Sequence, residues 1–96
     1  MVDITIRDVR QILNLIFKND EKLRRNLELM SSKDLYKVDM SKEFGLDSWG
    51  FEDILNELYY NFSINVDIAA MQKSAFAKKP TVENFIEMVN DIGYYY

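Results

Sequence analysis

The stretch GLDSWGF, residues 45–51, decides how the rest of the sequence is interpreted. It leads into a segment where apolar residues recur every three or four positions from Phe51 onward, which predicts an amphipathic helix. Asp47 is a residue type that caps helices, and a serine on the first turn exposes its hydroxyl beside unpaired backbone N–H groups. Ser48 is therefore either part of an ordinary helix start or a functional hydroxyl.

The composition favours one small helical domain. The 96 residues include 48% apolar and 29% charged side chains, enough for one compact core, so residues 1–96 are expected to form a single domain. Only three glycines and one proline occur, which favours helices over turn-rich strands. The charged first ten residues do not resemble a signal peptide, and no segment approaches membrane-spanning length. We therefore expect a cytoplasmic protein with no membrane partner.

The sequence contains neither cysteine nor histidine. Disulfides, thiolate metal sites and catalytic groups built on Cys or His are thereby excluded. No spacing of carboxylates demands a metal ion. We therefore predict a protein that is not an enzyme, with no catalytic residues and no metal site.

Acidic residues gather around the opening stretch. Residues 43–72 contain six acids and no Lys or Arg, so this segment carries −6 and the remainder of the chain +2, which sum to the net −4. Such a field repels nucleic acid and attracts basic protein surfaces, so we expect no nucleic-acid partner. A solvated helix face is the ordinary explanation for such a run of charge.

The first half of the sequence predicts one clear helix and a long loop. Apolar spacing predicts a helix over residues 6–17, capped by Asp3 or Thr5. A separate short helix capped by Asp20 is preferred to an extension of the first. Residues 31–46 lack a sustained period and are expected to form a long loop with room for one short turn.

The second half predicts three further helices. These are a helix from Ser48 to about Asn61, a short helix capped by Asp67, and a last helix that Thr81 caps and Gly93 ends. Residues 94–96 are expected to fray, with a docked aromatic end as the alternative. No strand-like alternation competes with these helices. The predicted fold is all-α, a small four-helix bundle with a long loop between the helices at 6–17 and 48–61.

Two phosphate or metal motifs nearly fit the opening stretch. Gly45 and Gly50 have the glycine spacing of a P-loop, but Phe51 and Glu52 stand where that motif needs Lys and Ser or Thr. An EF-hand loop starting at Asp39 would lack both its glycine and its bidentate glutamate. The sequence therefore supports neither nucleotide nor calcium binding.

Three blocks in order resemble the acyl carrier protein family. They are GLDS at residues 45–48, NFSINVDI at 61–68 and PTVENFIEMVNDI at 80–92, and the resemblance covers roughly residues 35–92. In that family a Gly, an apolar residue and Asp-Ser precede the second helix, and the serine receives 4'-phosphopantetheine from coenzyme A. The resemblance implies a small carrier-type bundle with this covalent cofactor.

The resemblance also assigns roles to individual residues. It implies that Ser48 is the attachment site and that Asp47 caps the helix and helps a phosphopantetheinyl transferase hold its metal ion. The partner-binding residues would be Trp49, Glu52, Asp53 and Glu57. They would meet basic patches on the transferase and on acyl- or aminoacyl-loading and acyl-transfer enzymes.

The same resemblance implies that the arm carries thioester-linked intermediates, as in fatty acid or secondary metabolite biosynthesis. The protein would act as a monomer. The cargo stays open among fatty acyl, peptidyl or other aminoacyl, and D-alanyl groups.

Some residues in this region have two interpretations. Trp49 departs from the leucine that is common there, and it suits either the core or an exposed anchor. Gly45 can supply an unusual backbone angle, and Gly50 inside a helix indicates a need for clearance near Ser48. Several residues are expected to be core, and a second interpretation lets some of them open a pocket for an acyl chain: Ile54, Leu58, Tyr59, Ile68, Met71, Phe85 and Met88.

The alternative function belongs to another class. A small helical protein–protein adaptor could keep the carrier-like bundle and bind a partner through Trp49 and the acidic face without ever receiving the arm. Trp49, Gly50 and the poorly matched first third of the chain favour that alternative.

Overall fold

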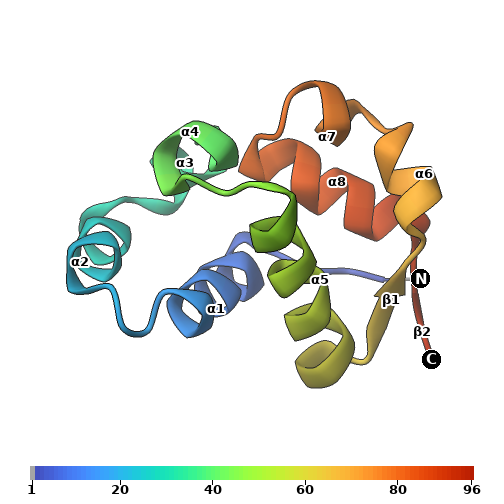
Figure 1. Ribbon diagram of the computed structural model, residues 1–96, viewed down its shortest axis with the longest axis horizontal. Coiled ribbons are helices and arrows are strands. Elements are labelled where there is room, and N and C mark those ends of the chain that lie inside the picture. Colours follow the sequence, from blue (N-terminus) through green and yellow to red (C-terminus); the bar gives the residue numbers. More distant parts are fainter. Residues whose placement is uncertain (1) are drawn as a thin grey trace.

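The computed structural model describes residues 2–96 (Figure 1). Within these residues the protein is mostly helical, with eight helices and one pair of short strands. The helices are α1 (Ile6–Ile16), α2 (Glu21–Leu29), α3 (Ser32–Tyr36), α4 (Met40–Phe44), α5 (Ser48–Phe62), α6 (Ile68–Gln72), α7 (Ala75–Lys78) and α8 (Val82–Ile92), and the strands are β1 (Ile64–Val66) and β2 (Gly93–Tyr95).

Side-chain caps start the helices where the sequence predicts them. The carboxylate of Asp8 accepts a hydrogen bond from the backbone N–H of Thr5 at 2.9 Å, which fixes the start of α1. Asp20 caps α2, so the prediction of a separate second helix is confirmed. Asp67 caps α6 and Thr81 caps α8, as expected.

The prediction of a long loop over residues 31–46 is wrong, although the one short turn that it allowed, from Ser31 to Asp34, is present. This segment contains α3 and α4, which Ser31 and Asp39 cap through hydrogen bonds of 3.1 and 3.0 Å. Each helix has only five residues, so neither is long enough to produce a sustained apolar period. The segment is tied to the start of α8, because the N–H of Met40 donates to the carbonyl of Pro80 at 2.8 Å.

A strand pair was missing from the all-α prediction. β1 and β2 are antiparallel, with Ile64 opposite Tyr95 and Val66 opposite Gly93. The expectation that residues 94–96 fray is wrong, and the alternative of a docked aromatic end is confirmed. Strands of three residues are too short to show an alternating pattern, and their pairing joins segments far apart in the sequence.

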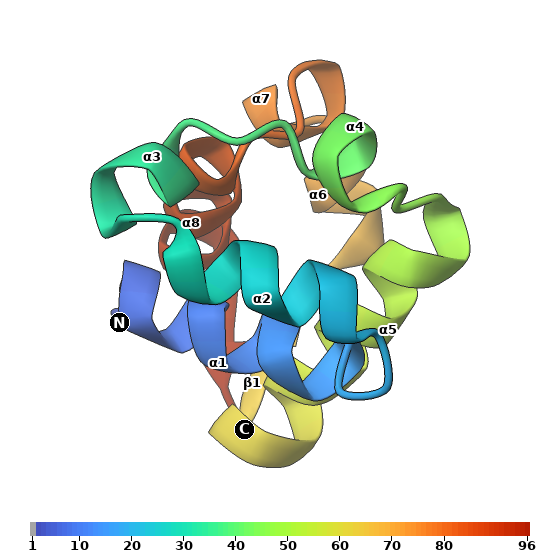
Figure 2. The same cartoon turned by 90° about the vertical axis from the view of Figure 1, so that its left-hand side faces the viewer.

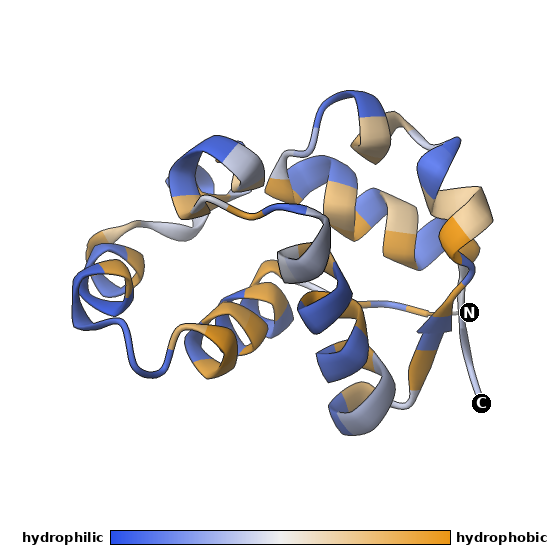
Figure 3. Ribbon diagram, viewed as in Figure 1, coloured by the Kyte–Doolittle hydropathy of each residue, from blue (hydrophilic) through white to orange (hydrophobic). Residues whose placement is uncertain are grey.

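One hydrophobic core joins the long helices. Figure 3 shows apolar stripes on α1, α5 and α8. Fully buried side chains come from nearly every element, including Leu13 of α1, Leu35 of α3, Leu58 of α5 and Val89 of α8. Burial of this apolar surface is the main stabilising term for so small a protein.

In the N-terminal third, α2 packs against α1. Figure 2 shows α2 lying along α1. The guanidinium of Arg10 on α1 donates hydrogen bonds to the carbonyls of Leu27 and Met30 at the end of α2. None of the helices in residues 2–96 is long and apolar enough to cross a membrane.

Candidate functional site

The turn between α4 and α5 determines how Ser48 is presented. Gly45 ends α4 in the left-handed conformation, with φ of 62°, so the unusual backbone angle predicted for it is confirmed. Leu46 then tucks into the core with 8% of its surface exposed. This inward anchor fixes the direction in which α5 begins.

Asp47, and not Ser48, caps α5. Its carboxylate accepts a hydrogen bond from the N–H of Gly50 at 3.0 Å, and its carbonyl accepts the first helical bond from Phe51 at 3.1 Å. The cap predicted for Asp47 is confirmed. Ser48 is the first helical residue, and it is exposed to solvent. Its hydroxyl is therefore not needed to start the helix and is accessible from outside.

The first turn of α5 presents an aromatic residue and acids to solvent. Trp49 has 74% of its surface exposed, so its placement in the core is wrong and the exposed alternative is confirmed. Glu52 and Asp53 are exposed one turn further on, and Glu57 is half-buried. The structure thus brings Ser48, Trp49 and the first two acids together at one end of α5, with Glu57 beyond them.

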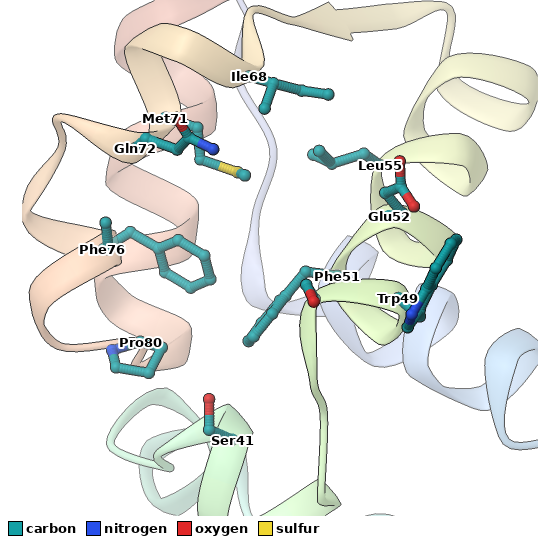
Figure 4. Close-up of a pocket in the computed structure, with 12 residues that line it drawn as sticks. Ser41, Trp49, Phe51, Glu52, Leu55, Ile68, Met71, Gln72, Phe76 and Pro80 are labelled. Atoms are coloured by element: carbon teal, nitrogen blue, oxygen red, sulfur yellow. The ribbon is translucent and has the colours of Figure 1, made fainter.

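An apolar groove opens beside Ser48 between α5 and the α6–α7 segment. Its volume is about 520 Å³. Figure 4 shows Phe51 and Leu55 of α5 pointing toward side chains on the opposite wall. That wall comprises Ile68, Met71 and Phe76.

Polar groups stand at the margins of the groove. Ser41 of α4 lies at one end of the groove, close to Pro80, as Figure 4 shows. The other polar side chains of the lining include Ser48 and Glu52, and Trp49 lines the groove beside them. The ring of Phe51 meets the ring of Phe76 edge-on, with centroids 5.3 Å apart. The groove therefore has apolar, partly aromatic walls with polar side chains at its margin, a composition typical of ligand-binding clefts.

Most of the residues expected in the core are buried, and two are not. Ile54, Leu58, Phe85 and Met88 are buried as predicted. Ile68 is 48% exposed and Tyr59 is 39% exposed, so their assignment to the core is wrong. Ile68 lines the groove, as the second interpretation allowed, whereas Tyr59 does not.

Met71 and Phe76, in the segment after α5, contribute to the groove in different ways. Met71 is half-buried, packs against the core and lines the groove. Phe76, which sequence reasoning missed, lies in a short segment whose four-residue helix gives no periodic signal.

The clearance predicted from Gly50 is real but serves a different neighbour. A Cβ atom at Gly50 would come within 2.6 Å of Cδ2 of Leu46. Glycine therefore allows Leu46 to pack under the first turn of α5. The clearance predicted near Ser48 is thus present, and the described neighbour that needs it is Leu46.

Within residues 2–96 no group of three or more acidic side chains is arranged to hold a metal ion. The groove is lined by apolar, hydroxyl, amide and single carboxylate groups, so the described residues can bind and orient a ligand.

The chain was compared with protein-family models, with curated proteins and with solved structures, and none of the three comparisons found a match.

Proposed function

We propose that this protein is an acyl or aminoacyl carrier whose Ser48 hydroxyl accepts 4'-phosphopantetheine. One observation carries the proposal: Ser48 is exposed on the first turn of α5, Asp47 performs the capping, and an apolar groove begins beside it. In this proposal α1, α5, α6 and α8 correspond to the four helices of the carrier bundle, and the protein itself performs no bond chemistry.

The start of α5 suits a phosphodiester. The cap of Asp47 engages the N–H of Gly50, while the N–H groups of Ser48 and Trp49 belong to the first turn, which has no helical acceptors for them. An anion near these groups is stabilised by roughly 0.3 to 1 kcal/mol through the helix dipole. The negative charge of Asp47 opposes this effect in part.

The groove has the character needed to shelter an arm or its cargo. Phe51, Leu55 and Met71 offer apolar surface, and Ser41 and Gln72 offer polar groups at the same groove. When attached, phosphopantetheine supplies a terminal thiol, which the cysteine-free chain lacks. Ser48 would hold the arm at the mouth, and the aromatic walls would exclude water from part of it.

The acidic exposed face supports transient docking of basic enzymes. Glu52 and Asp53 lie within a segment that contains no Lys or Arg from residue 43 to residue 72. Exposed charge pairs are weak and are screened by salt, so partners would associate quickly and leave after each step. The transferase and the loading and transfer enzymes are the proposed partners.

The test is a labelling reaction on the purified protein. Coenzyme A, magnesium and a phosphopantetheinyl transferase of broad substrate range are added, and intact mass is measured. We expect a gain of one phosphopantetheine group, with the hydroxyl proton of Ser48 replaced and 3',5'-adenosine diphosphate released. Ser48→Ala should gain nothing.

Ser41→Ala is the matched control, because this serine lines the same groove on a different helix. It should be modified like the wild type. An unchanged mass of the wild-type protein, in a reaction that modifies a known carrier, would end the carrier proposal. Modification of Ser48→Ala would leave the carrier class standing and overturn the site.

Trp49 favours a second candidate, the adaptor that never receives an arm. An indole 74% exposed beside an apolar groove is a suitable anchor for a protein partner. The labelling reaction separates the two candidates, since only the carrier changes mass.

A further inference from the structure

A cluster of exposed tyrosines lies at the other end of α5. Tyr59 and Tyr60 belong to its last turns, and the ring of Tyr96 stacks on Tyr59 with centroids 4.3 Å apart and planes 15° apart. Tyr60 meets Tyr59 edge-on at 5.2 Å. We call Tyr59, Tyr60 and Tyr96 the tyrosine cluster. Figures 1 and 2 both show the C-terminal strand ending beside this part of α5.

The strand pair holds the cluster in place. The hydroxyl of Tyr96 donates to the carbonyl of Tyr59 at 2.5 Å, and its N–H donates to the carbonyl of Ser63 at 3.2 Å. The amide of Asn65 donates to the hydroxyl of Tyr94 at 2.8 Å. The stacked pair of Tyr59 and Tyr96 is therefore held in place before any partner arrives, which lowers the entropic cost of binding to it.

Stability of the fold accounts for only some of the contacts that these tyrosines make. Tyr96 closes the end of α5, but Tyr60 is 76% exposed and Tyr96 itself is 60% exposed. Aromatic side chains left in water on a rigid support are typical of interaction surfaces. The cluster is also remote from Ser48, because Tyr60 lies twelve residues later, roughly 18 Å along the helix axis.

The charge around the cluster indicates the chemistry of its partner. Glu57 lies about one turn before Tyr60 on α5, and its carboxylate accepts a hydrogen bond from the side-chain amide of Asn61. Residues 43–72 include no Lys or Arg that could supply a cation from the same segment. A guanidinium stacks on a tyrosine face and pairs with a carboxylate at the same time, which a compact ammonium does less well.

We infer that the tyrosine cluster with Glu57 is a docking surface for an arginine-containing segment of a basic protein partner. This surface is separate from the groove at Ser48 and does not depend on attachment of the arm.

The test uses two peptides of equal length and charge, nona-arginine and nona-lysine, titrated onto the full chain at low salt. Binding and the shifts of tyrosine NMR signals are measured. We expect tighter binding of the arginine peptide, with the largest shifts at Tyr60. Tyr60→Ser should weaken arginine binding about two- to fivefold while changing lysine binding less.

Leu29→Ser is the control variant, because Leu29 is 80% exposed on α2, which α1 separates from this cluster. This variant should leave the affinities of both peptides unchanged.

Glu57→Gln should weaken the binding of both peptides and reduce the preference for arginine. Equal affinities of the two peptides, or no effect of Tyr60→Ser, would overturn the inference. So would binding of anionic lipid vesicles but not of peptide, or self-association that Tyr60→Ser abolishes. Tyr60→Ser should still gain the arm in the labelling reaction, which keeps this test separate from the carrier proposal.

Discussion

The two ends of α5 are built in different ways. At its start, the carboxylate of Asp47 caps the helix by accepting a hydrogen bond from the N–H of Gly50. The turn at Gly45 and the buried Leu46 determine the direction in which the chain enters the helix. At its end, Ser63 takes a left-handed conformation and the chain enters β1, whose partner strand β2 directly follows the C-terminal end of α8. The first end depends on neighbouring residues, whereas the second depends on pairing between distant segments. Local signals therefore predicted both ends of the helix, the second to within one residue, but not the strand β1 that follows it.

The largest expected effect tests whether the structure at the C-terminal end of α5 is stabilised by packing of β1 against the core. Ile64 of β1 is 2% exposed, so Ile64→Ala should lower the free energy of unfolding by about 2 to 5 kcal/mol through lost burial and a cavity. Urea unfolding measures this change. The control is Ile68→Ala, the same chemical change at a residue 48% exposed, which should cost about 1 kcal/mol or less. Equal losses would show that burial does not distinguish the two sites.

A pair of glycines compares the two ends more directly. A Cβ at Gly93 would come within 2.4 Å of the carbonyl oxygen of Val89, a backbone atom that cannot move aside alone. Gly93→Ala should therefore cost about 2 to 3 kcal/mol, by forcing β2 away from the end of α8. Gly45→Ala meets nothing within 4 Å and should cost about 1 kcal/mol, from its φ of 62°.

Urea unfolding again gives both values. A larger loss for Gly45→Ala than for Gly93→Ala would mean that backbone strain before α5 outweighs steric conflict at the end of α8, which is the reverse of the expected order.

These differences explain how much of the fold the sequence could predict. Each of the five predicted helices begins directly after a residue type that caps helices. The helices α1, α5 and α8 are also long enough to show their apolar period. The short helices α3 and α4 have caps but no period, and β1 and β2 have neither. Pairing of Ile64 with Tyr95 is decided by tertiary packing, which one sequence does not display.

The candidate site divides in the same way. The position of Ser48 on the first turn and the cap at Asp47 follow from adjacent residues, and both were predicted. The second interpretation allowed a pocket at residues such as Ile68 and Met71, and both line the groove. Its place beside Ser48 was not predicted, because it needs Phe76 to face Phe51 across a gap that only the fold creates. Exposure of Trp49 could not be decided from the sequence either, since Leu46 occupies the inward position beneath this turn.

Substitutions at Asp47 sharpen the comparison by separating stability from modification. Asp47→Ala removes the hydrogen bond to the N–H of Gly50 and should lower the free energy of unfolding by about 1 kcal/mol. Asp47→Asn keeps a capping oxygen and should lower the free energy of unfolding by only a few tenths of a kcal/mol. If the acid also serves the transferase, both variants should gain mass more slowly than the wild type. Rapid modification of Asp47→Asn would limit Asp47 to capping.

The smallest expected effect concerns Trp49, on the same first turn. Because 74% of its surface is exposed, Trp49→Ser should change the free energy of unfolding by no more than about 0.5 kcal/mol. Trp49 is the only tryptophan, so unfolding of this variant is followed by circular dichroism. The comparison variant is Phe51→Ser, whose half-buried ring packs on Phe76, and its loss should be clearly larger. A loss for Trp49→Ser that matched Phe51→Ser would mean that the indole packs into the groove in solution, and the first end of α5 would then depend on tertiary contacts as the second does.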